Sequence, residues 1–533
     1  MAEKFNRATF TRNFLKNLTR IKNPDEMLAE ANEGSGLEKT LGVWDLILLG
    51  VGAIIGSGIF AVVGIAAAGS PDGSSLGAGP ALAVSMIIAA IACVFSALCY
   101  SEFATMIPVA GGAYTYTFAT LGEFAAWMVG WVLMLEYAIG FIAVACAWSN
   151  YFVQFMAGFE KVLPSWLAHP PVWLTTDVFS ASKIAAANPD VFIPTLFGVP
   201  ICINLPAIVM VILTTLILIK GTKDSAKMAG IMVFIKLAVI ALFVLAGAFY
   251  VTPENWTPFA PNGFNGIFAG AFIIFFAYIG FDALATTAEE CKNPQKDLPI
   301  GIIGSLIVTT IVYVLVALIM TGMISTSGNV PTEFLKAPLS FCMSMVHQDW
   351  IAGLISIGAL AGLTSVLLVM EMATTRILFA MSRDHFISKR FQRIHPKFKT
   401  PVLLTWTVGA LAILGILTLN LNIAAELCNY GTFTSFIIVC VAVLILRHTD
   451  PNRPRPFKVP FSPVTPILGI ICCGGLMVYK SLEAGSSALL FPVWLGVGAI
   501  IYLLYGFIRN RDNENKIHRE LVSGFLKDSD ESK

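Results

Sequence analysis

The sequence predicts an all-α polytopic membrane protein with twelve transmembrane helices. Of its 533 residues, 56% are hydrophobic and only 13% are charged, about half the charged share of an average soluble domain. So few charged residues cannot cover the surface of a soluble fold of this length, whereas a lipid bilayer accommodates apolar surface directly. Two further observations, the lengths of the apolar segments and the distribution of Lys and Arg, predict the same class.

Twelve apolar segments are long enough to cross a bilayer, which requires about 20 helical residues. Because no water reaches the backbone inside a bilayer, each segment is expected to be a helix. Several exceed the minimum length, so tilted helices are expected. The segments are 42–69, 81–107, 122–157, 199–219, 227–251, 264–288, 300–324, 350–382, 402–420, 427–447, 464–480 and 489–509.

The Lys and Arg residues are distributed unevenly between the two sides. With the N-terminus in the cytoplasm, 28 of the 34 fall on the cytoplasmic side, four fall outside, and two, Lys236 and Arg376, fall within spans. This positive-inside pattern predicts a multi-pass protein of the cell (plasma or inner) membrane with both termini cytoplasmic. The stretch 158–198 is then an outside loop, with a weakly helical character.

Other classes of protein find little support. The net charge of +1 gives no electrostatic reason to expect nucleic acid as a partner. Most of the ten Cys lie in apolar runs, and the six His lack metal-ligand spacing. The first 40 residues are polar and basic, unlike a signal peptide. Since no nucleophile–base pair, HExxH motif or phosphate loop is present, we expect no metal, no cofactor and no enzymatic activity.

The first span is unusually rich in glycine, with four in the nine residues Gly50-Val-Gly-Ala-Ile-Ile-Gly-Ser-Gly. Each glycine costs a helix about 1 kcal/mol relative to alanine. One interpretation is close helix packing, for which small residues are typical in membranes. A dinucleotide-binding loop is excluded because no strand precedes the glycines and no βαβ unit surrounds them.

The sixth span, five spans later, repeats this feature with Gly280 followed by the acid Asp282. Two Gly-interrupted spans in matching positions indicate a transporter site between two halves of the chain. A break frees N–H groups that attract a carboxylate and carbonyls that accept from an ammonium. Together, the two breaks predict a receptor for a zwitterion, such as an α-amino acid.

Several segments resemble the amino acid–polyamine–organocation superfamily, and within it the cationic amino acid transporter family. They are Gly42 to Gly64, Tyr100-Ser-Glu-Phe-Ala-Thr-Met-Ile-Pro-Val-Ala-Gly-Gly-Ala-Tyr, Phe281-Asp-Ala-Leu-Ala-Thr-Thr-Ala-Glu-Glu-Cys-Lys-Asn-Pro-Gln-Lys-Asp-Leu-Pro and Arg376-Ile-Leu-Phe-Ala-Met-Ser-Arg-Asp. The resemblance covers roughly 37–447, and its Glu-Glu-x-Lys-Asn-Pro segment is the most specific part.

The resemblance implies a LeuT-like fold of five-plus-five inverted repeats with broken first and sixth helices and two peripheral helices. The expected parts are a cytoplasmic tail (1–40), the first repeat (41–251), the second repeat (252–447), two peripheral helices (448–509) and a second cytoplasmic tail (510–533).

The resemblance also implies a substrate site. N–H groups and a hydroxyl of the first break would bind the substrate carboxylate, and backbone carbonyls of both breaks would bind its ammonium. Phe276 would in addition cover the side-chain pocket as a lid. The carboxylate residues are Gly56, Ser57 and Gly58, and the carbonyls belong to Ile54, Phe276, Ala277 and Ile279.

Lys236 lies in the middle of the fifth span among apolar residues. Buried lysines are costly, and their charge becomes titratable. Snorkelling to the membrane surface is the alternative, but Lys236 is nine residues beyond Lys227, about 13.5 Å along a helix. In proton-coupled bacterial members of the superfamily a lysine here ties the first span to the eighth. Thr364 and Ser365 are its expected partners in proton coupling.

Three further acids fall at membrane depth and are candidate cavity residues. Asp282 follows the second break, and Glu136 either lines the site's outer wall or makes a structural hydrogen bond between spans. Glu371 would favour a cationic substrate if it faced the cavity. We expect instead that it pairs with Arg376, five residues further on, because both charges need partners.

The sequence therefore predicts a secondary active amino acid transporter, specifically an H⁺-coupled symporter that works by alternating access. An amino acid exchanger and a non-transporting amino acid sensor with the same fold are the alternatives. The expected partners are a small amino acid, H⁺ and the lipid bilayer. Whether the substrate is cationic or small and neutral stays open, as does a small membrane subunit.

Overall fold

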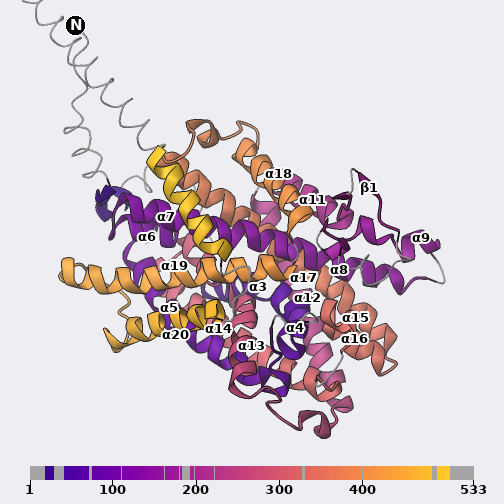
Figure 1. Ribbon diagram of the computed structural model, residues 1–533. Coiled ribbons are helices and arrows are strands. Elements are labelled where there is room, and N and C mark those ends of the chain that lie inside the picture. The colour runs from indigo at the N-terminus through magenta and orange to yellow at the C-terminus, as the bar shows by residue number, and fades with distance from the viewer. Residues whose placement is uncertain are drawn as a thin grey trace, which may run out of the picture.

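The computed structural model describes residues 18–28, 41–70, 75–109, 111–160, 163–178, 180–182, 192–196, 199–220, 222–326, 330–398, 400–419, 421–482 and 489–504. This part of the chain is a bundle of helices (Figure 1). Its one sheet is a two-residue antiparallel pair, β1 (Thr195–Leu196) with β2 (Val199–Pro200).

Among the described residues, eight helical stretches are long and apolar enough to cross a membrane. They are α5 (Leu82–Met106) with the turn η2 (Gly79–Ala81), α7 (Glu123–Met134) continuing through η3 (Leu135–Ile139) into α8 (Gly140–Ala157), α12 (Thr222–Gly247), α13 (Gly263–Phe275) with η7 (Phe276–Tyr278) and η8 (Asp282–Glu290), α14 (Pro294–Met323), α17 (Asp349–Arg383), α19 (Leu421–Thr449) and α20 (Val464–Leu482).

A ninth candidate is the bent pair of α3 (Val43–Ile54) with η1 (Gly58–Val62) and α4 (Val63–Ala68). Three shorter apolar helices are α11 (Leu205–Lys220), α18 (Val402–Thr418) and Leu489–Leu504. Each of the twelve predicted segments therefore contains an apolar helix, and the polytopic helical class is confirmed. That all twelve cross the membrane stays a prediction.

Shorter elements connect these helices. On one side lies α6 (Ala113–Phe118), and on the other lie α9 (Ser165–Ala168), η4 (Val172–Leu174) and the β1–β2 pair. In Figure 1, α9 and β1 are at the edge opposite α6, as expected for an outer and an inner loop. The remaining short helices are η5 (Ala248–Tyr250), η6 (Pro253–Trp256), α15 (Thr332–Lys336), α16 (Pro338–Met345) and η9 (Lys389–Gln392).

The first span breaks between Ile54 and Gly58. Ile55 is extended, with φ −72° and ψ 100°, and the two halves are bent by 42°. The helix restarts as a π-helical turn, η1, before α4. The glycine-rich sequence thus produces a real interruption of the helix and not only a close packing surface.

The second break lies between α13 and η8. Ile279 is extended, with ψ 137°, and Gly280 has a φ of +122°, which L side chains rarely adopt. A Cβ on Gly280 would lie 2.9 Å from the carbonyl oxygen of Ala53 in the first span. The second break is therefore in direct contact with the end of α3.

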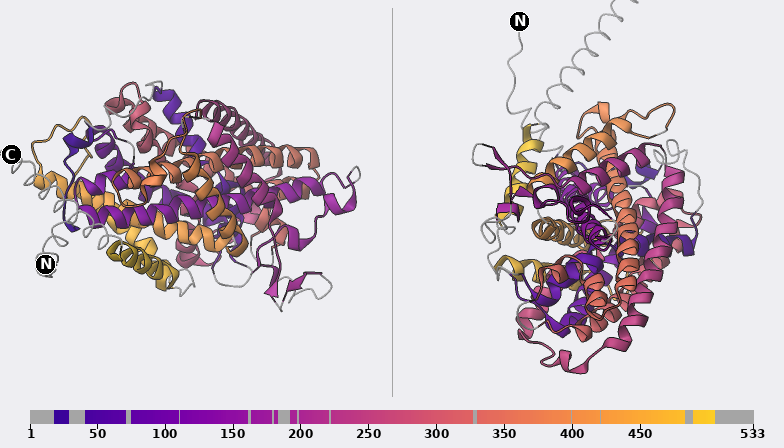
Figure 2. Two further views of the ribbon diagram at one scale, coloured as in Figure 1. Left: turned by 90° about the horizontal axis from the view of Figure 1, so that it is seen from above. Right: turned by 90° about the vertical axis from the view of Figure 1, so that its right-hand side faces the viewer.

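Around the breaks, α3 packs against α14, α12 and α17, while α5 packs against α14 and α13. The labels of α3, α12, α14 and α17 accordingly fall together near the middle of Figure 1. Helices α8 and α19 contact each other and run lengthwise beside this group, and Figure 2 shows the same bundle from two further sides. This packing buries both breaks, with Ser57 2% and Phe276 4% exposed.

Candidate functional site

The N–H groups predicted to bind a carboxylate lie at the first break, deep in the bundle. Ser57 is only 2% exposed. A Cβ on Gly58 would lie 2.2 Å from the Cα of Ala277, so Gly58 packs directly on the second break. A Cβ on Gly56 would lie 2.9 Å from a methyl group of Val366 on α17. The eighth span therefore approaches the first break with an apolar side chain.

The carbonyls predicted to bind an ammonium come from both breaks, and all four residues are buried. Two of these carbonyls meet at one side chain that the sequence did not suggest. The Tyr313 hydroxyl, on α14, lies 3.0 Å from the Ile54 oxygen and 2.8 Å from the Ala277 oxygen. The only sequence signal was a polar tip in the apolar run Ile311-Val-Tyr-Val.

Lys236, on α12, is completely buried and does not snorkel. Its Nζ donates to the Gly52 carbonyl, to the Ile55 carbonyl at 2.7 Å and to the Ser365 hydroxyl at 3.2 Å. The Ser365 hydroxyl gives its own proton to the Gly362 carbonyl at 2.8 Å, so it can only accept from Lys236. Three acceptors thus surround Nζ, and they connect α12 with the end of α3 and with α17.

The Thr364 hydroxyl makes its hydrogen bonds away from Lys236, its predicted partner. Its hydroxyl accepts from Trp148 Nε1 at 3.1 Å and donates to the Leu360 carbonyl at 2.7 Å. Neighbouring helical residues point about 100° apart, so only one of the two hydroxyls can face α12.

Asp282 and Glu136 are neighbouring carboxyl groups beside the second break. Asp282 accepts from the Tyr137 hydroxyl and, at 3.3 Å, from the N–H of Gly280. Glu136, on η3, accepts from the Ser435 hydroxyl of α19 at 3.1 Å. Glu136 was expected either to line the outer wall of the site or to make a structural hydrogen bond between spans. The contact with Ser435 is a hydrogen bond of the second kind.

Glu371 is completely buried on α17, and its partner is not Arg376. One carboxylate oxygen accepts from the Thr215 hydroxyl of α11 at 2.6 Å. The other has no hydrogen-bond partner among the described residues. Residues five apart on a helix point about 140° away from each other, which separates the two charges. Glu371 therefore faces α11, away from the breaks.

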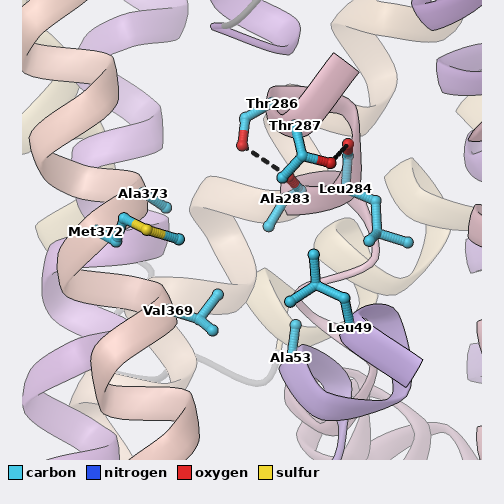
Figure 3. Close-up of a pocket in the computed structure, with 9 residues that line it drawn as sticks. All are labelled: Leu49, Ala53, Ala283, Leu284, Thr286, Thr287, Val369, Met372 and Ala373. Carbon is cyan, nitrogen blue, oxygen red and sulfur yellow. Dashed lines mark hydrogen bonds between the residues drawn. The ribbon is translucent and has the colours of Figure 1, made fainter. Parts of the chain in front are cut away.

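A small pocket lies between α3, η8 and α17, beginning at Ala53 beside the first break (Figure 3). Its threonine hydroxyls are turned to their own helix, because Thr286 donates to Ala283 and Thr287 to Leu284. The lining is consequently almost entirely apolar. It consists of Leu49, Ala53, Ala283, Leu284, Thr286, Thr287, Val369, Met372 and Ala373.

Within the described residues, no three His, Cys, Asp or Glu side chains cluster as a metal site would require. The centre of the molecule combines backbone groups of two broken helices with three buried ionisable side chains, Lys236, Asp282 and Glu136.

These features define a class: a polytopic helical membrane protein in which two interrupted helices meet at the centre. The family model described as amino acid permease matches residues 41–507, so the chain belongs to this family. It is a membrane transporter of the amino acid–polyamine–organocation superfamily and not an enzyme.

Similar proteins cover nearly the whole chain. The branched-chain amino acid permease BcaP of Bacillus subtilis is 43% identical over 93% of this chain and 99% of its own length. The methylthioribose transporter of the same organism is 41% identical over 91% of this chain and 97% of its own length. Cationic amino acid transporter 9, chloroplastic, of Arabidopsis thaliana is 35% identical over 79% of this chain and 68% of its own length. This similarity supports the predicted resemblance to the cationic amino acid transporter family.

Proposed function

We propose that the protein is an H⁺-coupled amino acid symporter that works by alternating access. The observation that carries the proposal is the set of three acceptors around Lys236 Nζ. A neutral amine has two N–H donors and a lone pair, so one acceptor would then face the lone pair. The bonded arrangement therefore suits the protonated lysine, and loss of the proton weakens the connection between α3 and α17.

The substrate binds where the two breaks meet. Its carboxylate accepts from the first break at Gly56, Ser57 and Gly58, where a restarting helix offers N–H groups and a positive dipole end. Its ammonium donates to carbonyls of Ile54, Phe276, Ala277 and Ile279, with Phe276 covering the side-chain pocket.

The proton reaches Lys236 from outside and leaves to the cytoplasm, in step with the substrate. With the ammonium formed, α3 and α17 are held together and the site keeps its binding shape. After the proton leaves, the two helices separate. The apolar pocket beside Ala53, which lies between these two helices and η8, then widens into the exit path.

A neutral aliphatic amino acid is the substrate favoured by the side chains nearest the breaks. Val366 and Phe276 are apolar. Of the acids that could attract a cationic side chain, Glu371 faces α11, and Asp282 already accepts from the Tyr137 hydroxyl and the Gly280 N–H. The likeness to a branched-chain amino acid permease supports the same choice. Arginine is the competing substrate, from the likeness to cationic amino acid transporters.

Methylthioribose is a second candidate because a transporter of that name is nearly as similar. This sugar has neither an ammonium nor a carboxylate. It would leave the freed N–H groups and carbonyls of both breaks without charged partners, so we rank it below an amino acid.

The rest of the architecture follows the same proposal. All twelve apolar helices cross the inner or plasma membrane, the two termini are cytoplasmic, and 41–251 and 252–447 form inverted repeats. The contact between two breaks five spans apart is what such a repeat would produce.

The test is uptake into proteoliposomes of labelled leucine, alanine, arginine and methylthioribose, with and without an inwardly directed proton gradient. We expect leucine to accumulate only with the gradient. Lys236→Ala and Lys236→Met should remain folded and lose this accumulation. The matched control is Lys480→Ala, since Lys480 on α20 is also buried but pairs with Glu426 on α19 at 3.3 Å.

Accumulation by Lys236→Ala in response to the gradient would show that the lysine is only a structural tie. Counterflow without any response to the gradient would identify an exchanger. Saturable binding of leucine without uptake would identify a sensor.

A further inference from the structure

Tyr313 joins the two broken helices through a single hydroxyl group. Its side chain is completely buried on α14, and its ring packs edge-on against Tyr278 with centroids 5.3 Å apart. The hydroxyl lies within hydrogen-bond distance of the Ile54 and Ala277 carbonyls, one from each break.

These two carbonyls are available because the helices stop there. Ile54 is the last residue of α3, and Gly58, whose N–H would bond to it in a continuous helix, lies beyond the extended Ile55 in the restarted turn η1. Ala277 lies in η7, two residues before the extended Ile279. Each oxygen therefore lacks the helical N–H that would normally occupy it.

A tyrosine hydroxyl has one proton, so it shares that proton between the two oxygens and leaves each a free lone pair. Two carbonyl dipoles that converge without a donor would repel each other. The shared proton therefore holds both oxygens at a fixed separation before any substrate arrives, and their remaining lone pairs can accept from a second donor group.

We propose that Tyr313 is a positioning residue that presets the carbonyl cage for the substrate's primary ammonium. The inference rests on the proposed function, because it assigns the cage to an amino acid. It predicts that the protein distinguishes a primary ammonium, with three N–H donors, from an N-methylated one with two, and that this distinction depends on the Tyr313 hydroxyl.

The test compares Tyr313→Phe with Tyr278→Phe. Both changes remove one buried hydroxyl from the same ring pair. Tyr278 itself lies in η7, within the second break, but its hydroxyl donates to the Met86 carbonyl on α5 at 3.1 Å and to no carbonyl of either break, so Tyr278→Phe leaves those carbonyls with their partner. Uptake is measured for leucine, alanine and arginine, and for the N-methyl derivative of whichever has the lowest KM.

For Tyr313→Phe we expect KM to rise about tenfold, with little change in the maximal rate per folded transporter. The preference for the parent amino acid over its N-methyl derivative should shrink by a similar factor. Tyr278→Phe should keep the wild-type preference even if its thermal unfolding midpoint falls. An unchanged KM and preference in Tyr313→Phe would overturn the inference, as would equal losses in both variants.

Two size-matched replacements keep the inference testable if Tyr313→Phe does not fold. At position 313, 4-aminophenylalanine retains a donor, whereas 4-methylphenylalanine fills the same space without one. The amino variant should retain the preference and the methyl variant should lose it; equal behaviour of the two would overturn the inference. If the wild-type protein transports none of the three amino acids, the proposed function fails first and the inference falls with it.

Discussion

Gly58 is the residue at which the two broken helices come closest. The atom that an added Cβ would meet, 2.2 Å away, is the Cα of Ala277. Backbone cannot rotate aside as a flexible side chain can, so any side chain at position 58 must push the second break away. The carbonyl of Ala277 would move with it.

We expect Gly58→Ala to weaken substrate binding strongly and Gly58→Val to abolish it. Overpacking of this kind also costs about 1–3 kcal/mol of stability, so the unfolding midpoint should fall in the same order. Both effects are measured by thermal shift with and without substrate. Gly353→Ala on α17 is the control, because a Cβ there meets nothing within 4 Å. Normal uptake by Gly58→Val would remove the first break from the site.

The residues that could be predicted from the sequence were those that violate the rules of a membrane helix. Lys236 is conspicuous because a charge at that depth is costly, and the glycines because they weaken a helix. Tyr313 escaped notice because tyrosine is ordinary in a membrane protein and its two acceptors come from remote spans. Ser365 and Thr364 could not be separated, since only the rotation of α17 decides which one faces α12.

At the scale of elements, α17 is the helix that the candidate site depends on most. It contacts α12 through Ser365, approaches the first break through Val366 and contacts α11 through Glu371. These three contacts leave the helix in different directions. A change on the α11 side should therefore alter the stability of the helix packing without altering the selectivity of the site.

Glu371→Gln tests this separation. Glutamine keeps an oxygen that can accept from Thr215, so we expect a change in stability below about 1 kcal/mol. The KM values for leucine and arginine should change by the same factor. Uptake competition between the two amino acids measures this, with Thr215→Val as the companion variant that removes the donor. A selective loss of arginine would mean that Glu371 faces the substrate after all.

The existence of the helices was more predictable than their internal form. Apolar length and the positions of the glycines indicated every segment and both interruptions. The π-helical restart at Gly58 and the 3₁₀ form of η8 were not predicted. Such local forms depend on the packing of neighbouring helices, which composition and periodicity do not record.

At the scale of the whole molecule, charged pairs connect elements that are far apart in the sequence. Lys22 of the N-terminal segment lies 3.1 Å from Asp384, just beyond α17, and Arg447 of α19 pairs with Glu102 of α5. All four residues belong to the side that the Lys and Arg distribution assigns to the cytoplasm. The transmembrane topology and the inverted repeats are proposals, and the arrangement of the helices is compatible with both.

The position of Lys236 has a thermodynamic consequence for the whole transporter. Its hydrogen bonds are divided between α3 and α17, so the proton favours the same packed arrangement that the substrate favours. Linkage then requires reciprocity: the factor by which protonation tightens substrate binding equals the factor by which substrate tightens proton binding.

Reciprocity can be measured by calorimetry in buffers of different ionisation enthalpy. The number of protons taken up per leucine bound should equal the slope of log Kd against pH, and both should fall to zero in Lys236→Met. Unequal values, or a slope that persists in the variant, would place the coupling elsewhere. If they agree, the membrane gradient acts on this protein as a difference in substrate affinity between its two sides, transmitted by a single shared set of hydrogen bonds.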